Sequence, residues 1–397
     1  IRRPPRSTLF PTRRSSDLYM NKKINYAPGP TETRENVRLA RAEKTTNPDI
    51  DIDFVEFYKK TCEKFGNIIG TKNDVYILSG EGILGLEAAC ASLTEKGDRV
   101  LVIDNGIYGE GFKDFVTMYG GEYVLFSSEY TKSIDIDELK AFLDEDSNFK
   151  YATVVHCDTP TGVLNDVSKI CPLLKKYGIL TVVDSVAGMV GERLSVDESK
   201  IDIILGGSQK AISAPAGLTI VGISQDAKNC IKNRKTDVIG FYCNLNIWEG
   251  YYEKKYFPYT MPISDIMGLD KALDNILEEG IENVLNRHEK IAYSVRKSIE
   301  EYGLELFLEE GYSNTVTAIK VPESIGALEL TDYMLKNYNT LVATSLNQYM
   351  DTILRIGHMG ENANLNKIEH VLNVLDKSLS ALGFKGNGNL LNLFNKY

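Results

Sequence analysis

The chain has 397 residues, of which 43% are hydrophobic and 25% charged, and its formal net charge is −10. That length suffices for two domains, or for one large and one small domain. The negative charge argues against nucleic acid as the main partner, which normally needs a basic face. No apolar run approaches the roughly 18 residues that cross a bilayer, so we expect no membrane span.

Six cysteines are scattered along the chain without CxxC spacing. This pattern is typical of reduced thiols in a cytoplasm rather than of a disulfide framework or a zinc site. We therefore expect a cytoplasmic protein whose site uses no metal.

The first 19 residues differ in composition from the rest of the chain. They contain five arginines and three prolines, and Met20 then opens a lysine-rich and acidic sequence. The segment shows no amphipathic helical period, and its prolines would break a helix, which disfavours a transit peptide. We interpret residues 1–19 as a non-native leader that resembles translated sequencing-adapter sequence.

Between about residues 55 and 225, short apolar runs alternate with helical patterns. The runs are rich in Val, Ile and Leu on both faces, as in strands of a mostly parallel sheet that helices cover on both sides. This α/β domain should carry its functional groups at the C-terminal ends of the strands. The predicted strands are residues 75–78, 100–103, 152–155, 180–183, 201–205 and 218–223.

Beyond about residue 265, long amphipathic helices and a few strands indicate a smaller α+β domain. We expect a large domain at 20–265 with an N-terminal arm, a small domain at 266–382 and a tail at 383–397. The tail is rich in Asn and Gly, so we expect it to be frayed or loosely docked. The predicted helices are 265–279, 281–302, 326–338 and 364–382, and the predicted strands are 315–321, 340–346 and 352–357.

A turn with two glycines directly follows the first predicted strand. Gly80, Glu81, Gly82 and Ile83 open the next helix, where free backbone N–H groups can hold a phosphate. Alone the signal is weak, because the turn lacks the third glycine of a dinucleotide fingerprint and the lysine of a P-loop. Glu81 is awkward beside a phosphate unless its side chain points away.

Three further strand ends carry side chains with both a structural and a functional interpretation. Tyr108 fits a half-buried turn residue or a plate on which a planar ring stacks. Thr159 is placed to donate to a ring substituent, whereas His156 is expected to be a satisfied core histidine without a catalytic role. Asp184 fits a helix cap or the partner of a protonated pyridine nitrogen, since burying it ionised without a cation would be costly.

Lys210 lies in the motif GGSQKAISAPAG, residues 206–217, among small residues that follow an apolar run. Taken alone, such a lysine is more often solvated than the amine of a Schiff base. An anion turn, an aromatic ring, a hydroxyl and an aspartate at neighbouring strand ends change this balance. Together with Lys210 they supply the contacts that pyridoxal 5′-phosphate (PLP) needs, so the sequence predicts a PLP site.

The sequence resembles the class V, fold-type I PLP-dependent aminotransferases, in particular their alanine–glyoxylate/serine–pyruvate group. The likeness runs from Tyr26 to about residue 380, and its most specific motifs are VVDSVAG (182–188), GGSQKAISAPAG and LRIGHMG (354–360). It implies the transfer of an amino group from alanine or serine to a 2-oxo acid such as glyoxylate or pyruvate. It also implies a homodimer with active sites at the subunit interface.

The same resemblance assigns roles to individual residues. Lys210 would form the Schiff base with the cofactor and Asp184 would pair with the pyridinium nitrogen, which makes both catalytic. Tyr108 occupies the stacking position. The residues expected to bind the cofactor are Gly80, Glu81, Gly82, Ile83, Tyr108, Thr159, Asp184, Gln209, Lys210 and Thr260.

Arg355 lies in an apolar strand, where an unpaired guanidinium would be costly. Its planar fork suits a substrate carboxylate held by two parallel hydrogen bonds. The resemblance gives it that role, with Gly29 lining the same pocket in the cleft between the domains.

One position departs from the pattern of the family. Thr260 matches a phosphate contact donated by the neighbouring subunit, and relatives often have an aromatic hydroxyl three residues earlier. This chain has Phe257 there. Whether Tyr256 or Tyr259 substitutes for it is left open.

Several alternatives accompany this interpretation. Cysteine desulfurase-like enzymes usually have His-Lys at the aldehyde-binding position and a catalytic cysteine in the C-terminal half, whereas this chain has Gln209-Lys210 and no cysteine after Cys243. A 2-aminoethylphosphonate transaminase is harder to exclude, because a phosphonate also suits an arginine. A non-catalytic binding protein on the same fold is disfavoured by the intact site residues. A nicotinamide dehydrogenase would need a fingerprint that is absent.

Overall fold

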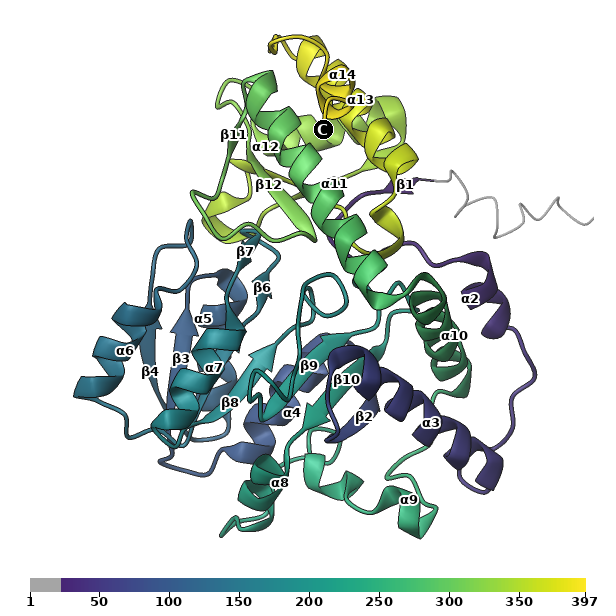
Figure 1. Ribbon diagram of the computed structural model, residues 1–397, viewed down its shortest axis with the longest axis vertical. Helices are drawn as coiled ribbons and strands as arrows, with labels where there is room; N and C mark the ends of the chain where they lie inside the picture. The colour runs from purple at the N-terminus through teal and green to yellow at the C-terminus, as the bar shows by residue number, and fades with distance from the viewer. Residues whose placement is uncertain (1–22) are drawn as a thin grey trace, which may run out of the picture.

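The computed structural model describes residues 23–397, which form a larger part built on a sheet and a smaller part beside it (Figure 1). The predicted leader, residues 1–19, lies outside the described residues. Within 23–397, no helix combines the length and apolar character that crossing a membrane requires.

A seven-stranded sheet with the order β2-β10-β9-β8-β5-β3-β4 forms the centre of the larger part. Neighbouring strands are parallel except at β10, which runs antiparallel to both β2 and β9. The mostly parallel sheet predicted from the apolar runs is confirmed. Strand β4 escaped prediction because its side chains are only half-buried or exposed. The strands are β2 (Asp74–Ser79), β3 (Arg99–Asp104), β4 (Glu122–Ser127), β5 (Tyr151–Val155), β8 (Leu180–Asp184), β9 (Ile203–Gly207) and β10 (Leu218–Ile223).

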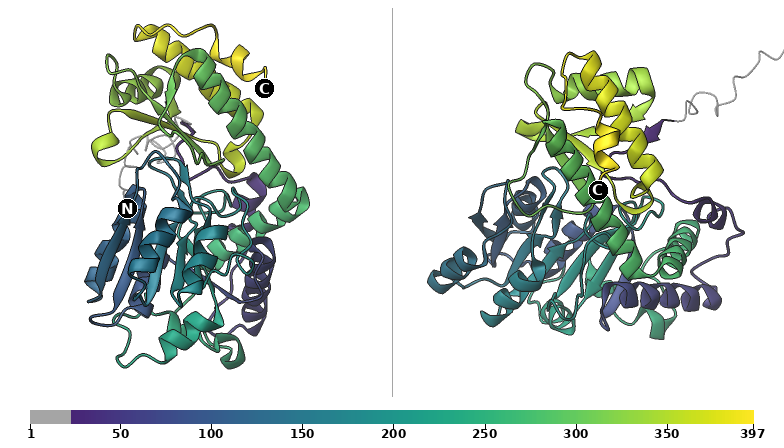
Figure 2. Two further views of the ribbon diagram at one scale, coloured as in Figure 1. Left: turned by 60° about the vertical axis from the view of Figure 1, so that its left-hand side comes forward. Right: turned by 45° about the horizontal axis from the view of Figure 1, so that its top comes forward.

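Helices cover both faces of this sheet (Figures 1 and 2). Helices α4 and α5 pack against each other, and so do α6 and α7. Every side chain of β5 is buried, which explains why its sequence is a continuous apolar run without alternation. The helices are α2 (Glu35–Ala40), α3 (Ile52–Ile69), α4 (Gly82–Leu93), α5 (Ile107–Met118), α6 (Ile136–Glu145), α7 (Val167–Lys176), α8 (Gln225–Lys232), η1 (Leu245–Trp248), α9 (Tyr251–Lys254) and α10 (Ile263–Glu279).

The smaller part is built on a four-stranded antiparallel sheet with the order β11-β12-β15-β14. Helix α11 extends from the larger part along it (Figures 1 and 2). The predicted break between α10 and α11 at Gly280 is confirmed. Its elements are α11 (Ile281–Tyr302), β11 (Glu305–Leu306), β12 (Val316–Lys320), α12 (Ala327–Tyr338), β13 (Thr340–Leu341), β14 (Ala343–Thr344), η2 (Asn347–Tyr349), β15 (Ile353–Gly357), η3 (Gly360–Asn362), α13 (Leu365–Ala381) and α14 (Leu390–Phe394).

The C-terminal tail is docked, and the prediction of a frayed or loosely attached segment is wrong. Leu390, Leu393 and Phe394 of α14 are buried in the core of the smaller part, against α11 and α13. Asn389 caps the helix by accepting a hydrogen bond from the Asn392 N–H. Apolar residues at i, i+3 and i+4 give this short helix a face that packs, despite the surrounding Asn and Gly.

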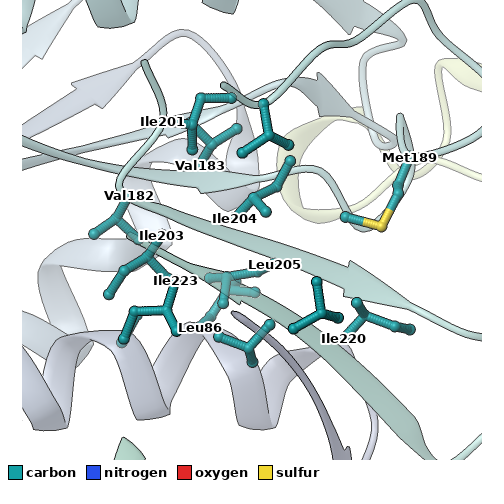
Figure 3. Close-up of a cluster of buried hydrophobic side chains, with 14 of the residues drawn as sticks. Leu86, Val182, Val183, Met189, Ile201, Ile203, Ile204, Leu205, Ile220 and Ile223 are labelled. Carbon is teal, nitrogen blue, oxygen red and sulfur yellow. The ribbon is translucent and has the colours of Figure 1, made fainter. Parts of the chain in front are cut away.

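Two main hydrophobic clusters support the two parts. The larger surrounds the seven-stranded sheet, and Figure 3 shows where β8, β9, β10 and Leu86 of α4 meet in it. The smaller joins Tyr26 to side chains of α11, α12, α13 and β15. The apolar face of α10 packs in the larger cluster. The predicted domain boundary between residues 265 and 266 falls inside this helix, and it stays a prediction.

The N-terminal arm connects the two parts. Strand β1 (Ile24–Asn25) pairs in parallel with β13, and the Tyr26 carbonyl accepts a hydrogen bond from the Gly357 N–H at 2.7 Å. Five residues further on, the Thr31 N–H donates to the carbonyl of Gln209 at 2.9 Å. The arm therefore passes directly over the loop that carries the predicted lysine.

Candidate functional site

A pocket lies at the carboxyl edge of the seven-stranded sheet, beyond the ends of β2, β3, β8 and β9. Because these strands end at one edge, residues far apart in the sequence meet there. Four further residues line the pocket without having been assigned from the sequence: Leu86, Cys157, Val186 and Ala187. The predicted residues that line it are Glu81, Gly82, Ile83, Tyr108, Thr159, Asp184 and Lys210.

Lys210 follows β9 and enters the pocket from the sheet side. Its Nζ donates a hydrogen bond to the Pro28 carbonyl at 2.7 Å. Burial and the positive charge of Arg355 lower the pKa of Lys210, against the opposing effect of Glu81 and Asp184. A lower pKa increases the share of neutral amine, which is the form that attacks a carbonyl carbon.

Gly29 lies in van der Waals contact with this lysine. Its φ is +86°, and a Cβ built on it would lie 2.4 Å from Cδ of Lys210 and 2.9 Å from Nζ. The position therefore needs glycine both for the left-handed backbone and for the space. Gly29 contacts a residue that lines the pocket but is not itself among the lining residues, so its place in the substrate pocket stays a prediction.

We expect Gly29→Ala to displace the Lys210 side chain and to lower kcat by about 100-fold, since small displacements of a reacting group cost rates of this order. Gly97→Ala is the matched control, because Gly97 has a φ of +85° and open space where the Cβ would lie. Steady-state kinetics and thermal unfolding of both variants separate the effect of the contact with Lys210 from the effect of backbone strain. An equal loss of activity in both would contradict the steric explanation.

Asp184 is the last residue of β8 and is 5% exposed. Its Oδ1 accepts a hydrogen bond from the Val186 N–H at 2.8 Å. Burial raises the pKa of Asp184 to about 7, and nearby Asp158 adds to this while Val186 and Lys210 oppose it. A carboxyl in this setting is stabilised in its ionised form by a cationic partner.

Tyr108 is fixed by an aspartate that the sequence analysis did not single out. The Tyr108 N–H donates to Oδ2 of Asp158 at 2.8 Å, and burial raises the pKa of Asp158 to about 6. A Cβ on Gly106 would lie 2.4 Å from Cγ of Asp158, so the glycine before α5 admits the carboxylate. The sequence signal for Asp158 is an acidic residue at the end of a predicted strand, directly before Thr159.

The turn at the start of α4 holds the predicted anion site. Gly80 has a φ of +158°, and its N–H donates to the Gly217 carbonyl at 2.8 Å. The Glu81 carboxylate points back into the turn, where it accepts from the Ile83 N–H at 3.1 Å and from Nε2 of Gln209 at 2.6 Å. Gln209 thus joins the site through Glu81.

Arg355 of β15, in the smaller part of the molecule, contacts the wall of the pocket. Its guanidinium donates to the Thr344 carbonyl from Nε at 2.8 Å and from Nη2 at 2.6 Å. Nη1 donates to the Thr159 carbonyl at 3.0 Å, so Arg355 and a residue that lines the pocket are in direct contact. Backbone carbonyls orient the guanidinium without neutralising its charge, which leaves it able to attract a carboxylate.

Thr260 does not line the pocket within one chain, and its hydroxyl donates to Oδ2 of Asp49 at 3.0 Å. Phe257 is buried against Tyr58. Of the two candidate substitutes for the missing aromatic hydroxyl, Tyr256 is 62% exposed. Tyr259 accepts a hydrogen bond from the Ser79 N–H at 3.4 Å, next to the α4 turn.

His156 lies behind the pocket as a core residue. It is 3% exposed, and its Nδ1 lies 2.9 Å from Oγ of Ser185. Burial lowers the pKa of His156 to about 4. The imidazole is therefore neutral near pH 7, as expected for a structural histidine.

Comparison of the sequence with known proteins gives one consistent result. The model of the family described as "Aminotransferase class-V" matches residues 39–360. The chain is 35% identical to an uncharacterized aminotransferase of Methanocaldococcus jannaschii, over 92% of this chain and 94% of that protein. It is 30% identical to an alanine–glyoxylate aminotransferase of Drosophila melanogaster, over 93% of this chain and 95% of that protein.

Comparison of the fold agrees with the sequence. The crystal structure of pyridoxamine–pyruvate aminotransferase from Mesorhizobium loti superposes with a TM-score of 0.90 at 29% identity. The superposition covers 94% of this chain and 96% of that one. The likeness extends over both parts of the molecule.

Proposed function

The chain belongs to the class V aminotransferase family, and from that membership we propose that it moves the amino group of alanine or serine to a 2-oxo acid such as glyoxylate or pyruvate. It is a PLP-dependent transaminase. The observation that carries the proposal is one pocket lined by Lys210 and Asp184, with Arg355 bonded to its wall. An amine, an acid and a carboxylate-binding fork are what amino transfer from an amino acid requires.

The residues Lys210, Asp184 and Tyr108 of the pocket fit the ring and the aldehyde of the cofactor of this family, pyridoxal 5′-phosphate. Lys210 would bind its aldehyde, Asp184 its ring nitrogen and Tyr108 the face of its ring. The carboxyl of Asp184 is buried, and its pKa is raised to about 7. A cationic ring nitrogen beside it would stabilise the ionised form of this carboxyl. The phosphate end would lie at the start of α4.

When bound, PLP supplies an aldehyde that links to amines and a ring that withdraws electrons from the substrate. In the proposed mechanism, Lys210 Nζ would take the proton from the substrate Cα and return it to the carbon on the other side of the substrate nitrogen, and Asp184 would keep the ring nitrogen protonated. Arg355 holds the substrate carboxylate. The two substrates use the site in turn, so we expect ping-pong kinetics.

We expect Arg355→Lys to raise the KM of the amino acid by about 10- to 100-fold with a smaller effect on kcat. Lysine keeps the charge but loses the bidentate fork, and hydrogen bonds to charged groups are worth about 1.5–3 kcal/mol each. Arg296→Lys is the matched control, because Arg296 also donates to a carbonyl, that of Ser313, but its hydrogen bonds go to Ser313 and Asn314, neither of which lines the pocket. An unchanged KM in Arg355→Lys would contradict the proposed role.

The function is tested with the full chain, PLP and a panel of amino donors against glyoxylate and pyruvate. With alanine or serine as the donor, we expect the 2-oxo acid to be converted to its amino acid, measured by mass spectrometry. Faster turnover of 2-aminoethylphosphonate, or sulfide release from cysteine without amino transfer, would favour the related enzymes instead. Absence of turnover with every donor would favour a binding protein on this fold.

We also propose that the protein acts in the cytoplasm as a homodimer whose active sites lie at the subunit interface. Thr260 does not line the pocket of its own chain and donates to Asp49, which suits a contact to the neighbouring subunit. Three apolar side chains that precede Thr260 in the sequence are also 51–68% exposed: Ile239, Phe241 and Tyr242. Sedimentation equilibrium should give the mass of two chains.

A further inference from the structure

The phosphate end of the pocket already contains a carboxylate of the chain. Glu81 is the N-cap of α4, and its Oε2 accepts the N–H of Ile83. Its Oε1 accepts from Nε2 of Gln209. Both oxygens therefore use donors that would otherwise face an anion at this helix terminus.

Gln209 adds a second acceptor at the same place. The residue is 3% exposed, and its Oε1 has no hydrogen-bond partner within the described part of the chain. Its orientation is fixed, because a reversed amide would set the oxygen against the Glu81 carboxylate. A buried acceptor without a donor is costly. Gln209 is not among the residues that line the pocket, so it acts on this end of the pocket by holding the Glu81 carboxylate in place.

The charge of the pocket favours a group that donates hydrogen bonds. Among the described residues that line it, Lys210 is the one cation, whereas Glu81 and Asp184 are both acidic. A phosphate dianion carries only acceptors. At the start of α4 it would lie beside the Glu81 carboxylate, and neighbouring like charges repel strongly. A neutral hydroxymethyl group would instead donate its O–H to Glu81.

We propose that Glu81 weakens the binding of the cofactor's phosphate, so that the pocket binds the non-phosphorylated vitamer, with a 5′-hydroxymethyl group, about as tightly as the phosphorylated one. The inference rests on the proposed function, because it places the ring between Tyr108 and Asp184. The roles of Lys210 and Arg355 are unchanged by it.

Isothermal titration of the vitamer-free full chain tests the proposal with pyridoxamine and pyridoxamine 5′-phosphate, which differ only at the 5′ group. We expect the dissociation constant of pyridoxamine to exceed that of the phosphate ester by less than about tenfold. Glu81→Ser should increase this ratio by about 100-fold, because it removes the repulsion and frees the Ile83 N–H. Glu81→Gln should change it in the same direction and keeps the shape of the side chain.

Glu87→Ser is the matched control, because it removes a carboxylate from the same helix that contacts Tyr119 outside the pocket. Its ratio should equal that of the unaltered protein. A ratio above about tenfold in the unaltered protein, or one that neither Glu81 variant changes, overturns the inference. If it fails while the donor panel shows amino transfer, the proposed function stands, and if neither compound binds and no donor reacts, both fail.

Discussion

Lys210→Ala is expected to lower the rate of amino transfer by at least about 10³-fold, because it removes the nucleophile and the proton carrier together. The fold should survive, since within residues 23–397 Nζ makes one hydrogen bond, to the Pro28 carbonyl. Activity is measured for both half-reactions, and mass spectrometry after borohydride reduction detects cofactor attached to the chain. The variant should show no attachment at this position.

Rescue by small amines separates a chemical role for Lys210 from a structural one. Methylamine or ethylamine should restore part of the proton transfer to Lys210→Ala and should not alter the activity of the unaltered protein. Circular dichroism and thermal unfolding establish that the variant is folded. Amino transfer at more than about 1% of the original rate without added amine would contradict the assignment.

The sheet and most of its site were predictable because the polar residues of the site directly follow apolar strand segments in the sequence. A continuous apolar run followed by a polar residue marks a buried strand and its exit, and Asp184 and Lys210 are such residues. Parallel strands end at one edge, so the convergence of these side chains in one pocket follows from topology. The family resemblance added Arg355, whose place near the pocket depends on the separate β15 of the smaller part.

The remaining features depend on contacts between distant segments, which periodicity does not encode. Asp158 is one acidic residue in a polar loop until the fold sets its carboxylate against the Tyr108 N–H. Glu81 is recognisable in the sequence as awkward in an anion turn, but its hydrogen bond to Gln209 joins residues 128 positions apart. The docking of α14 likewise depends on the apolar faces of α11 and α13.

Asp184→Asn is expected to impair catalysis and, at the same time, to stabilise the protein without cofactor. Asparagine cannot hold the proton on the ring nitrogen by charge, which should cost on the order of 10²–10³-fold in kcat. Its amide oxygen can still accept the hydrogen bond that Val186 N–H gives to Oδ1. The substitution therefore removes the buried charge and preserves the local backbone.

The sign of the stability effect follows from the raised pKa of about 7 in the folded state, which burial causes. The unfolded chain releases this proton near pH 4, so the stability conferred by the protonated carboxyl is complete below that pH and is lost as the pH rises through about 7. At pH 8 the folded protein without cofactor must hold a buried, ionised carboxylate. Asp184→Asn removes that cost and should raise the free energy of unfolding by about 1–4 kcal/mol at pH 8, with little change at pH 4.

Denaturant unfolding of the cofactor-free proteins at pH 4 and pH 8 measures this difference. Asp202→Asn is the matched control, since Asp202 is equally buried but accepts hydrogen bonds from Lys175 Nζ at 3.0 Å. The substitution removes the buried ionic partner of Lys175 and leaves this lysine paired with the exposed Asp226, so the control should be less stable at pH 8. Destabilisation of both variants at pH 8 would mean that Asp184 has a cationic partner without cofactor. The opposite signs we expect would show a carboxylate held at a cost in stability for the cation it later binds.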